Sequence, residues 1–233
     1  MMVVFCAAIE PPRAGIWFLR PDLNGVLHLE GLPGSGKSTA AARLAELLLA
    51  DGQPAAWYVE EAHDHPVMPR ARRALCRESN FAQICLNAWR LHSAPRQERL
   101  TILDGCALQS TVRFMFEQRH SKIAIERYFA AWQALVPAQA LVYFWVASPA
   151  EHFAAVVAER GENWSRKVYH WVANTPVGKV SNWRGEDGFV EFWQQYQDLC
   201  LMLLNNAEIP SRIVPARSWN DASLCRLADE LLV

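Results

Sequence analysis

The stretch Gly31-Leu32-Pro33-Gly34-Ser35-Gly36-Lys37-Ser38, followed by Thr39, is the part of the sequence that decides the fold. It matches the pattern G-x-x-x-x-G-K-[ST], in which glycines let backbone N–H groups surround phosphate oxygens. The apolar run Val26–Leu29 precedes this stretch, and an amphipathic segment from Ser38 to Ala50 follows it. Because the pattern requires a strand before it and a helix after it, this context predicts a phosphate-binding loop.

The polar residues of the loop have expected roles toward a bound nucleotide. Lys37 would bring a positive charge to the β- and γ-phosphates, and the Ser38 hydroxyl would bind Mg²⁺. The positive end of the helix that starts near Lys37 would point at the same phosphates. We therefore expect ATP and Mg²⁺ as cofactors, with the nucleotide held by Gly31, Pro33, Gly34, Ser35, Gly36, Lys37, Ser38 and Thr39. A glycine turn without a ligand is the alternative.

Apolar runs alternate with helical patterns along the rest of the chain. Strands are predicted over 26–29, 55–59, 100–103, 141–146 and 213–214. Helices are predicted over 38–50, 81–92, 109–118, 122–135, 149–158, 189–204 and 218–232. This alternation is typical of an α/β fold with a parallel sheet covered by helices on both faces. Residues 161–188 are polar and aromatic with glycines between, which predicts a mobile excursion.

The composition excludes several classes of protein. Of the 233 residues, 52% are hydrophobic, which predicts a well-packed domain. The 23 Lys and Arg are balanced by 24 Asp and Glu, and this balance argues against general nucleic-acid binding. The longest apolar run inside the chain, 140–147, is too short to span a membrane. The six scattered cysteines fit neither a disulfide framework nor a zinc site, so we expect a cytoplasmic protein. Residues 1–24 read as an N-terminal extension before a domain over 25–233.

With its loop and its second, third and fourth predicted strands, the chain resembles the P-loop small-molecule kinases, in particular the thymidylate kinase-like branch. Glu30-Gly31, which leads into the loop, is similar to the end of that family's first strand. The resemblance implies a P-loop NTPase fold with a five-stranded parallel sheet in the order 2-3-1-4-5. It also implies ATP over the loop, a small-molecule acceptor between helices, and a lid segment at about residues 159–188.

One departure from that branch concerns the acceptor. Thymidylate kinases follow the third-strand aspartate with an arginine, whereas Asp104 is followed here by Gly105. The loop sequence Gly-Leu-Pro-Gly-Ser-Gly is also similar to the loops of kinases that phosphorylate hydroxyl groups on nucleic-acid ends, sugar nucleotides or antibiotics. The predicted function is therefore an ATP-dependent phosphotransferase, or kinase, with a small-molecule acceptor. The alternatives are a nucleoside or nucleoside monophosphate kinase proper, and a nucleotide-binding regulatory ATPase without an acceptor.

Three residues are predicted to carry the chemistry. Lys37 is one, and Asp104, at the end of the third predicted strand, is placed to bind Mg²⁺ through water or to accept a hydroxyl proton. The alternative for Asp104 is a turn-forming role before Gly105. Arg160, which the resemblance places in the lid, would neutralise charge on the transferring phosphoryl group. Arg166 and Lys167 are further basic residues of that segment.

The residues that would hold the two ligands are less tightly specified. Arg217 follows the fifth predicted strand, where the resemblance places adenine, and a guanidinium can stack on a base. The substrate candidates are Glu60, Glu61, Gln109 and Arg166, with Trp89 and Arg90 as further pocket candidates. Trp164, Trp171 and Trp183 lie in the expected lid segment, where they would cap the acceptor or pack the lid closed.

Two clusters remain open to more than one interpretation. His63, Asp64 and His65 follow Glu60 and Glu61, but the spacing fits no usual metal site, and a solvated loop is the alternative. A basic run follows, which is either a solvated helix face or a contact to an anionic acceptor, and it comprises Arg70, Arg72, Arg73 and Arg77. The oligomeric state also stays open, with a homodimer among the alternatives.

Overall fold

Five parallel strands form the centre of the computed structural model, which describes residues 24–60, 62–63, 65–93, 99–136 and 138–232. The strands are β1 (Gly25–Gly31), β2 (Ala55–Tyr58), β3 (Leu100–Asp104), β4 (Gln139–Trp145) and β5 (Ser211–Pro215). Their order is β2-β3-β1-β4-β5, which confirms the predicted topology. The predicted extension, apart from residue 24, and the candidates Glu61 and Asp64 lie outside the described residues.

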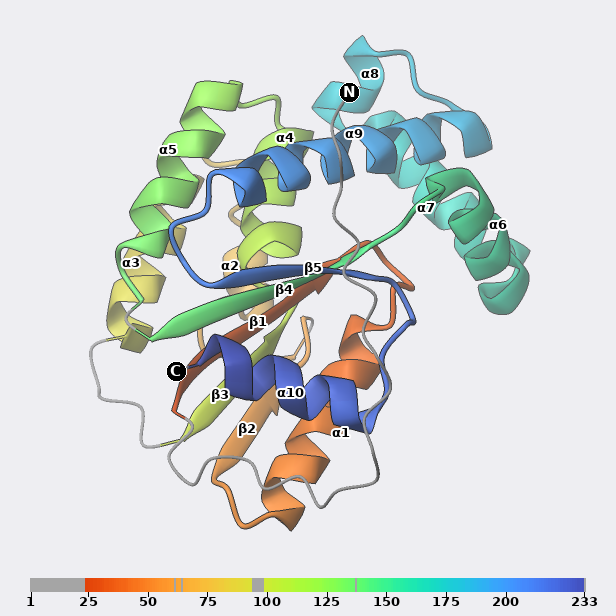
Figure 1. Ribbon diagram of the computed structural model, residues 1–233. Helices are drawn as coiled ribbons and strands as arrows, with labels where there is room; N and C mark the ends of the chain where they lie inside the picture. Colours follow the sequence, from red (N-terminus) through yellow and green to blue (C-terminus); the bar gives the residue numbers. More distant parts are fainter. Residues whose placement is uncertain (1–23, 61, 64, 94–98, 137, 233) are drawn as a thin grey trace.

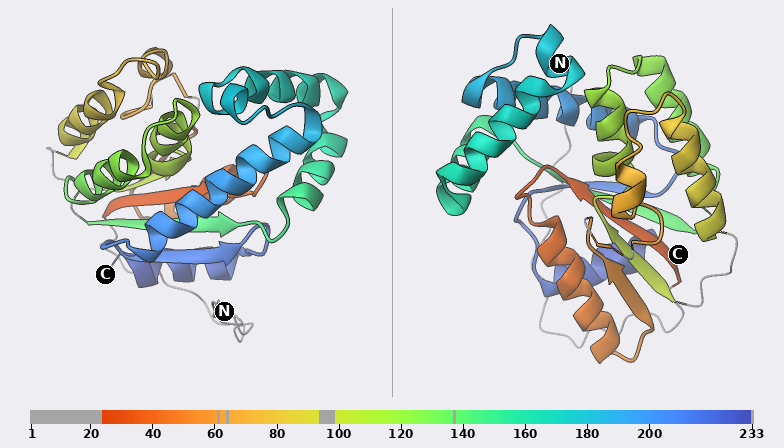
Figure 2. Two further views of the ribbon diagram at one scale, coloured as in Figure 1. Left: turned by 90° about the horizontal axis from the view of Figure 1, so that it is seen from above. Right: turned by 180° about the vertical axis from the view of Figure 1, so that it is seen from behind.

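Helices cover both faces of the sheet (Figures 1 and 2). One face carries α1 (Lys37–Ala50) and α10 (Asp221–Leu231). The other carries α3 (Phe81–Ser93), α4 (Arg113–Glu117), α5 (Lys122–Gln133) and α9 (Gly185–Asn205). The remaining helices are α2 (Arg70–Arg73), the π-helix η1 (Ala107–Val112), α6 (Pro149–Arg160), α7 (Glu162–Asn174) and α8 (Pro176–Val180). No described helix combines the length and hydropathy needed to cross a membrane.

The central strand β1 is buried along its whole length, as expected of a strand that helices cover on both faces. Leu27 and Leu29 pack toward α1 and α10, whereas Val26 packs into the core on the opposite face. His28 is fully buried between Trp89 and Trp132, with ring centroids 5.4 and 5.0 Å away. Burial lowers the pKa of His28 to about 3, so the imidazole is neutral. Trp89 is therefore a core residue rather than part of a pocket.

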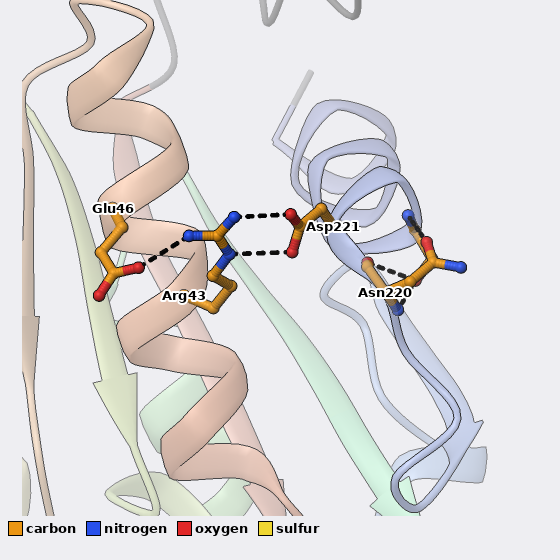
Figure 3. A network of polar contacts seen from close by, with 5 residues as sticks. Arg43, Glu46, Asn220 and Asp221 are labelled. Carbon is orange, nitrogen blue, oxygen red and sulfur yellow. Dashed lines mark hydrogen bonds and ion pairs between the residues drawn. The ribbon is translucent and has the colours of Figure 1, made fainter. Parts of the chain in front are cut away.

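An ion pair joins α1 to α10, the last helix of the chain (Figure 3). The Arg43 guanidinium donates to both carboxylate oxygens of Asp221, over 2.9 and 2.7 Å, and also donates to Glu46 over 2.9 Å. These hydrogen bonds lower the pKa of Asp221. Asp221 is the first residue of α10, and the Asn220 side chain caps this helix by accepting from the Ser223 N–H. The contact fixes the start of α10 beside α1.

Two segments differ from the sequence-based expectation. Residues 161–188, predicted as a mobile excursion, instead form α7 and α8 and the start of α9, with Val172 and Trp183 buried. Their polar composition is misleading because α7 buries only the side that faces its neighbours. The single helix predicted over 109–118 is instead a π-helix followed by a short α-helix. The predicted start of α6 is confirmed, with Pro149 in its first turn and Ser148 accepting from the Glu151 N–H.

Candidate functional site

The loop between β1 and α1 has the backbone that a phosphate-binding loop needs. Gly34 and Gly36 have φ angles of 80° and 95°, in the left-handed region that favours glycine. Helix α1 begins immediately afterwards at Lys37. Gly36 has no side chain to cap this helix, so the first N–H groups of α1 remain available to an anion.

The carbonyl oxygens of the loop are held by residues outside it. The Gly34 oxygen accepts from Nε of Arg217 over 3.0 Å, and the Ser35 oxygen accepts from the Arg217 N–H over 3.2 Å. Nε2 of His152 lies 2.8 Å from the Pro33 oxygen, and burial lowers the pKa of this histidine. A Cβ at Gly34 would lie 2.5 Å from a methyl carbon of Val156, so only glycine fits beside α6. These contacts stabilise the backbone conformation of the loop.

A second polar corner lies beside the loop, at the end of β3. Asp104 is fully buried and pairs in the sheet with Leu29 of β1, two residues before the loop begins. Gly105 follows with a φ of 65°, and a Cβ there would lie 3.1 Å from Glu60 Oε2, 3.2 Å from Lys37 Cε and 3.4 Å from Gln109 Oε1. A side chain at this position, such as the arginine of thymidylate kinases, would therefore require the side chains of Glu60, Lys37 and Gln109 to shift.

Glu30, the residue before the loop, holds the segment that follows this corner. Its two carboxylate oxygens accept the backbone N–H groups of Ala107 and Gln109 over 2.7 and 2.9 Å. The side chain is fully buried, and burial raises its pKa to about 7, although the backbone hydrogen bonds oppose the rise. Sequence reasoning assigned no role to this carboxylate, because its partners are backbone groups far along the chain.

One cavity of about 970 Å³ connects the loop with this corner and continues beyond both. Six residues of the predicted loop line it, namely Pro33, Gly34, Gly36, Lys37, Ser38 and Thr39. Asp104, Glu60 and Gln109 also line the cavity. Gly31 and Ser35, which were also predicted to hold the nucleotide, do not line the cavity. Gly31 is close to the Ser35 hydroxyl.

The cavity also has an aromatic wall, which consists of Phe114, Trp164, Trp171 and Trp193, and Val168 lines the cavity beside it. Trp164, Val168 and Trp171 recur at intervals of four and three residues, so they share one face of α7. This spacing is visible in the sequence, and it is the signal from which a helix could have been predicted in place of a mobile excursion. Trp183, the third tryptophan expected in the lid, lies in the core instead.

Arg113 lines the cavity against this aromatic wall, and the sequence did not indicate it as a site residue. Its guanidinium forms a buried ion pair with Glu117, and its Nε donates to the Gln109 oxygen over 2.8 Å. Its central carbon lies 4.4 Å from the ring centroid of Phe114 and 5.3 Å from that of Trp171. Gln109, Arg113 and Glu117 are spaced by four residues, which is the only sequence signal for this group.

The remaining basic candidates separate into two groups. Arg160 lines the cavity, with its guanidinium carbon 5.0 Å from the Trp164 ring, and Arg217 lines it beside the loop. Arg166 is exposed outside the cavity and lies 3.9 Å from Glu162, so its predicted contact with the substrate is not supported. Arg90 is also exposed, and it donates to Asn87 on its own helix.

Ser38 and Asp104 line the same cavity. A hydroxyl with a carboxylate is a donor set suited to Mg²⁺, which usually takes one or two protein ligands plus phosphate oxygens.

The cluster of histidines and carboxylates after β2 raises the separate question of a dedicated metal site. Such a site is not supported: among the described residues, no three His, Cys, Asp or Glu side chains are grouped to hold an ion. Nδ1 of His65 instead accepts the N–H groups of Val67 and Met68. This histidine therefore shapes the chain after β2.

No protein-family model matches the sequence, and no curated protein is significantly similar to it. Among solved structures, shikimate kinase from Bacteroides thetaiotaomicron is similar, with 14% identity, 90% and 98% of the two chains covered and a TM-score of 0.49. Bacillus subtilis YorR, in complex with phosphorylated GDP, has 14% identity, coverages of 86% and 91% and a TM-score of 0.47. A gluconokinase from Sinorhizobium meliloti has 18% identity, coverages of 90% and 92% and a TM-score of 0.43. Because these TM-scores are below 0.5, the function proposed below is based on the residues of the site.

Proposed function

We propose that the chain is an ATP-dependent phosphotransferase that moves the γ-phosphate of Mg-ATP to a small-molecule acceptor. The observation that carries the proposal is the single cavity in which the loop, with Lys37, meets the corner of Asp104 and then an aromatic wall. Its volume of about 970 Å³ lies at the upper end of the range of about 300–1,000 Å³ for ligand pockets. A cavity of this size has space beyond the loop for a second ligand.

The chain's own residues would share the work as follows. Lys37 and the N–H groups of the loop would hold the β- and γ-phosphates. Mg²⁺, held by Ser38 directly and by Asp104 through water, would neutralise phosphate charge when bound. Asp104 would orient the acceptor oxygen and accept its proton. Arg160, stacked on Trp164, would face the charge on the transferring group. Closure of α6 and α7 as a lid would exclude water from the reaction.

Two other functions stay as alternatives. A nucleoside or nucleoside monophosphate kinase proper would use the same loop. For a monophosphate acceptor, Gly105 stands where thymidylate kinases carry an arginine that helps to hold the acceptor phosphate. A regulatory ATPase would leave the aromatic end of the cavity without a small-molecule ligand. We also propose a cytoplasmic setting, which is supported by the lack of disulfides among the cysteines that the structure describes.

The test compares wild type with Lys37→Ala, each supplied with ATP, Mg²⁺ and pooled cell metabolites. Mass spectrometry then searches for any metabolite that gains one phosphoryl group. The proposal expects a phosphorylated product that depends on Lys37, and Lys122→Ala, on the exposed side of α5, serves as the matched control. ATP hydrolysis that depends on Lys37 without a phosphorylated metabolite would instead favour the regulatory ATPase.

A further inference from the structure

A histidine of α6 contacts the backbone of the phosphate-binding loop. Nε2 of His152 lies 2.8 Å from the Pro33 oxygen. A carbonyl oxygen can only accept a hydrogen bond, so Nε2 carries a proton and donates it. Burial lowers the pKa of this histidine, and the positive charges of Arg217 and Lys37 lower it further, although the hydrogen bond to the loop opposes the shift. The imidazole is therefore neutral at neutral pH, and its single N–H is directed to the loop.

This contact belongs to one face of α6 that packs on the loop. His152, Val156 and Glu159 are spaced by four and three residues, so they lie on the same side of the helix. A methyl carbon of Val156 lies 2.5 Å from the position that a Cβ of Gly34 would take. Glu159 accepts a hydrogen bond from Arg217 over 3.4 Å, and the same arginine donates to the Gly34 oxygen. Helix α6 therefore meets the loop, or the arginine that holds it, at three positions over about two turns.

The last residue of α6 is Arg160, which the proposed mechanism places opposite the transferring phosphoryl group. It follows His152 by eight residues, or about 12 Å along the helix axis. Its side chain lies over the Trp164 ring and lines the same cavity as Lys37 of the loop. Because the turns of a helix are joined by its own hydrogen bonds, a shift or rotation at residue 152 is passed on to residue 160. The contact with the loop therefore sets where the guanidinium of Arg160 lies.

Helix α6 is also attached to the core through an apolar side chain. Phe153 is buried, and its ring centroid lies 4.7 Å from that of Phe189 and 6.0 Å from that of Trp193, both on α9. Apolar burial is non-directional, so it holds α6 against α9 without fixing the rotation of the helix. The hydrogen bond of His152 adds a directional contact in the first turns of α6. For a lid formed by α6 and α7, this contact holds the base of the lid beside the nucleotide.

We propose that His152 is a positioning residue for phosphoryl transfer, whose N–H holds α6 on the loop and thereby places Arg160 opposite the γ-phosphate. The inference rests on the proposed kinase function. His152 does not line the cavity, so it acts through Arg160 and not on the ligands. In the reaction, the acceptor oxygen forms a bond to the γ-phosphorus, and the bond from that phosphorus to the β,γ-bridging oxygen breaks. The acceptor proton passes to Asp104 and then to solvent, while the proton of the imidazole stays on Nε2.

The test is a double-mutant cycle that combines His152→Leu with Arg160→Ala. Each full-length protein receives saturating γ-labelled ATP, Mg²⁺ and pooled cell metabolites, and label in phosphorylated metabolites and in inorganic phosphate is measured separately. His152→Leu should lower the rate of transfer by about tenfold or more, because small displacements of positioned groups have effects of this size. In the Arg160→Ala background the same substitution should change the rate by about twofold at most, because the residue through which His152 acts is gone.

A conservative variant tests whether the N–H is what matters. The amide nitrogen of His152→Gln can donate to the Pro33 oxygen, so transfer should return to within about threefold of the wild-type rate. If this variant is as slow as His152→Leu, the inference is wrong. His170→Leu, at an exposed position of α7, controls for the loss of an imidazole and should leave the rate unchanged. If His152→Leu does not fold, His152→Asn, whose amide is one carbon shorter than that of glutamine, takes its place in the cycle.

The remaining outcomes are distinct. An equal loss of rate in both backgrounds would show that His152 acts independently of Arg160, and it would overturn the inference. A wild-type rate for His152→Leu would overturn it as well. If the wild-type protein labels no metabolite but releases inorganic phosphate in a Lys37-dependent reaction, the proposed kinase function fails. The same cycle measured on phosphate release then decides separately whether His152 acts through Arg160.

Discussion

Replacement of the buried Glu30 by glutamine should change how the stability of the protein depends on pH. The pKa of Glu30 is raised from 4.5 to about 7, chiefly by burial. A carboxyl group whose pKa is raised by folding favours the folded state below its unfolded pKa, and this contribution is lost as the pH rises through the folded pKa. The wild-type chain should therefore lose unfolding free energy between about pH 4.5 and pH 7.

The magnitude follows from the two pKa values. At about 1.4 kcal/mol per pKa unit, their separation corresponds to about 3 kcal/mol of unfolding free energy. Glu30→Gln lacks this titration but still offers one oxygen to the N–H groups of Ala107 and Gln109. It should lose about 1 kcal/mol for the other hydrogen bond, at every pH. Relative to wild type, the variant should therefore gain about 3 kcal/mol as the pH rises.

The assay is urea unfolding of both proteins at several pH values from about 4.5 to about 8, read by circular dichroism. His28 also titrates on unfolding, but it is present in both proteins and cancels in the difference. Glu191→Gln, an exposed position on α9, is the matched control and should show no such trend. A difference between wild type and Glu30→Gln that stays constant across this range would refute the argument from burial.

Three further predictions concern other parts of the structure. Gly105→Ala and Gly52→Ala should each lower the unfolding free energy by about 1–2 kcal/mol, because both glycines have positive φ. Only Gly105→Ala should also lower ATP turnover, because a Cβ at Gly105 lies close to Glu60, Lys37 and Gln109, whereas a Cβ at Gly52 meets nothing within 4 Å. Arg160→Ala should lower kcat by about a hundredfold or more with little change in stability, whereas Arg127→Ala on α5 should not; equal rates would contradict the role of Arg160. The ring signals of His28 in an NMR titration should not move between about pH 5 and pH 8, because burial lowers its pKa to about 3; a midpoint near 6.5 would contradict its burial.

The sheet and the loop could be predicted from the sequence because each has a local signal. Leu141–Val146 is a continuous apolar run and Val26–Leu29 is apolar except for His28, which is typical of strands buried on both faces. The loop has a fixed pattern of glycines ending in Lys37 and Ser38. The order of the strands came from the resemblance, and the structure has the same order.

The acceptor end of the site could not be predicted in the same way. Glu30 binds backbone groups of Ala107 and Gln109, and a carboxylate that caps a distant segment leaves no pattern in a single sequence. The ion pair of Arg113 with Glu117 has the spacing of an ordinary surface pair, so its burial depends on how α4 packs against other elements. The polar composition of 161–188 concealed a helix, because only one of its faces is apolar.

The π-helix η1 has a consequence for the direction in which α4 presents its side chains. A π-turn contains about one residue more than an α-turn, and one residue corresponds to about 100° of rotation around an α-helix axis. The residues of α4, which continues directly from η1, are therefore rotated relative to the phase that uninterrupted α-helical winding would give. Arg113 and Phe114 come directly after η1, and both line the cavity. Shortening 107–112 by a single residue would turn this pair toward a different neighbour while leaving every side chain of the site chemically unchanged.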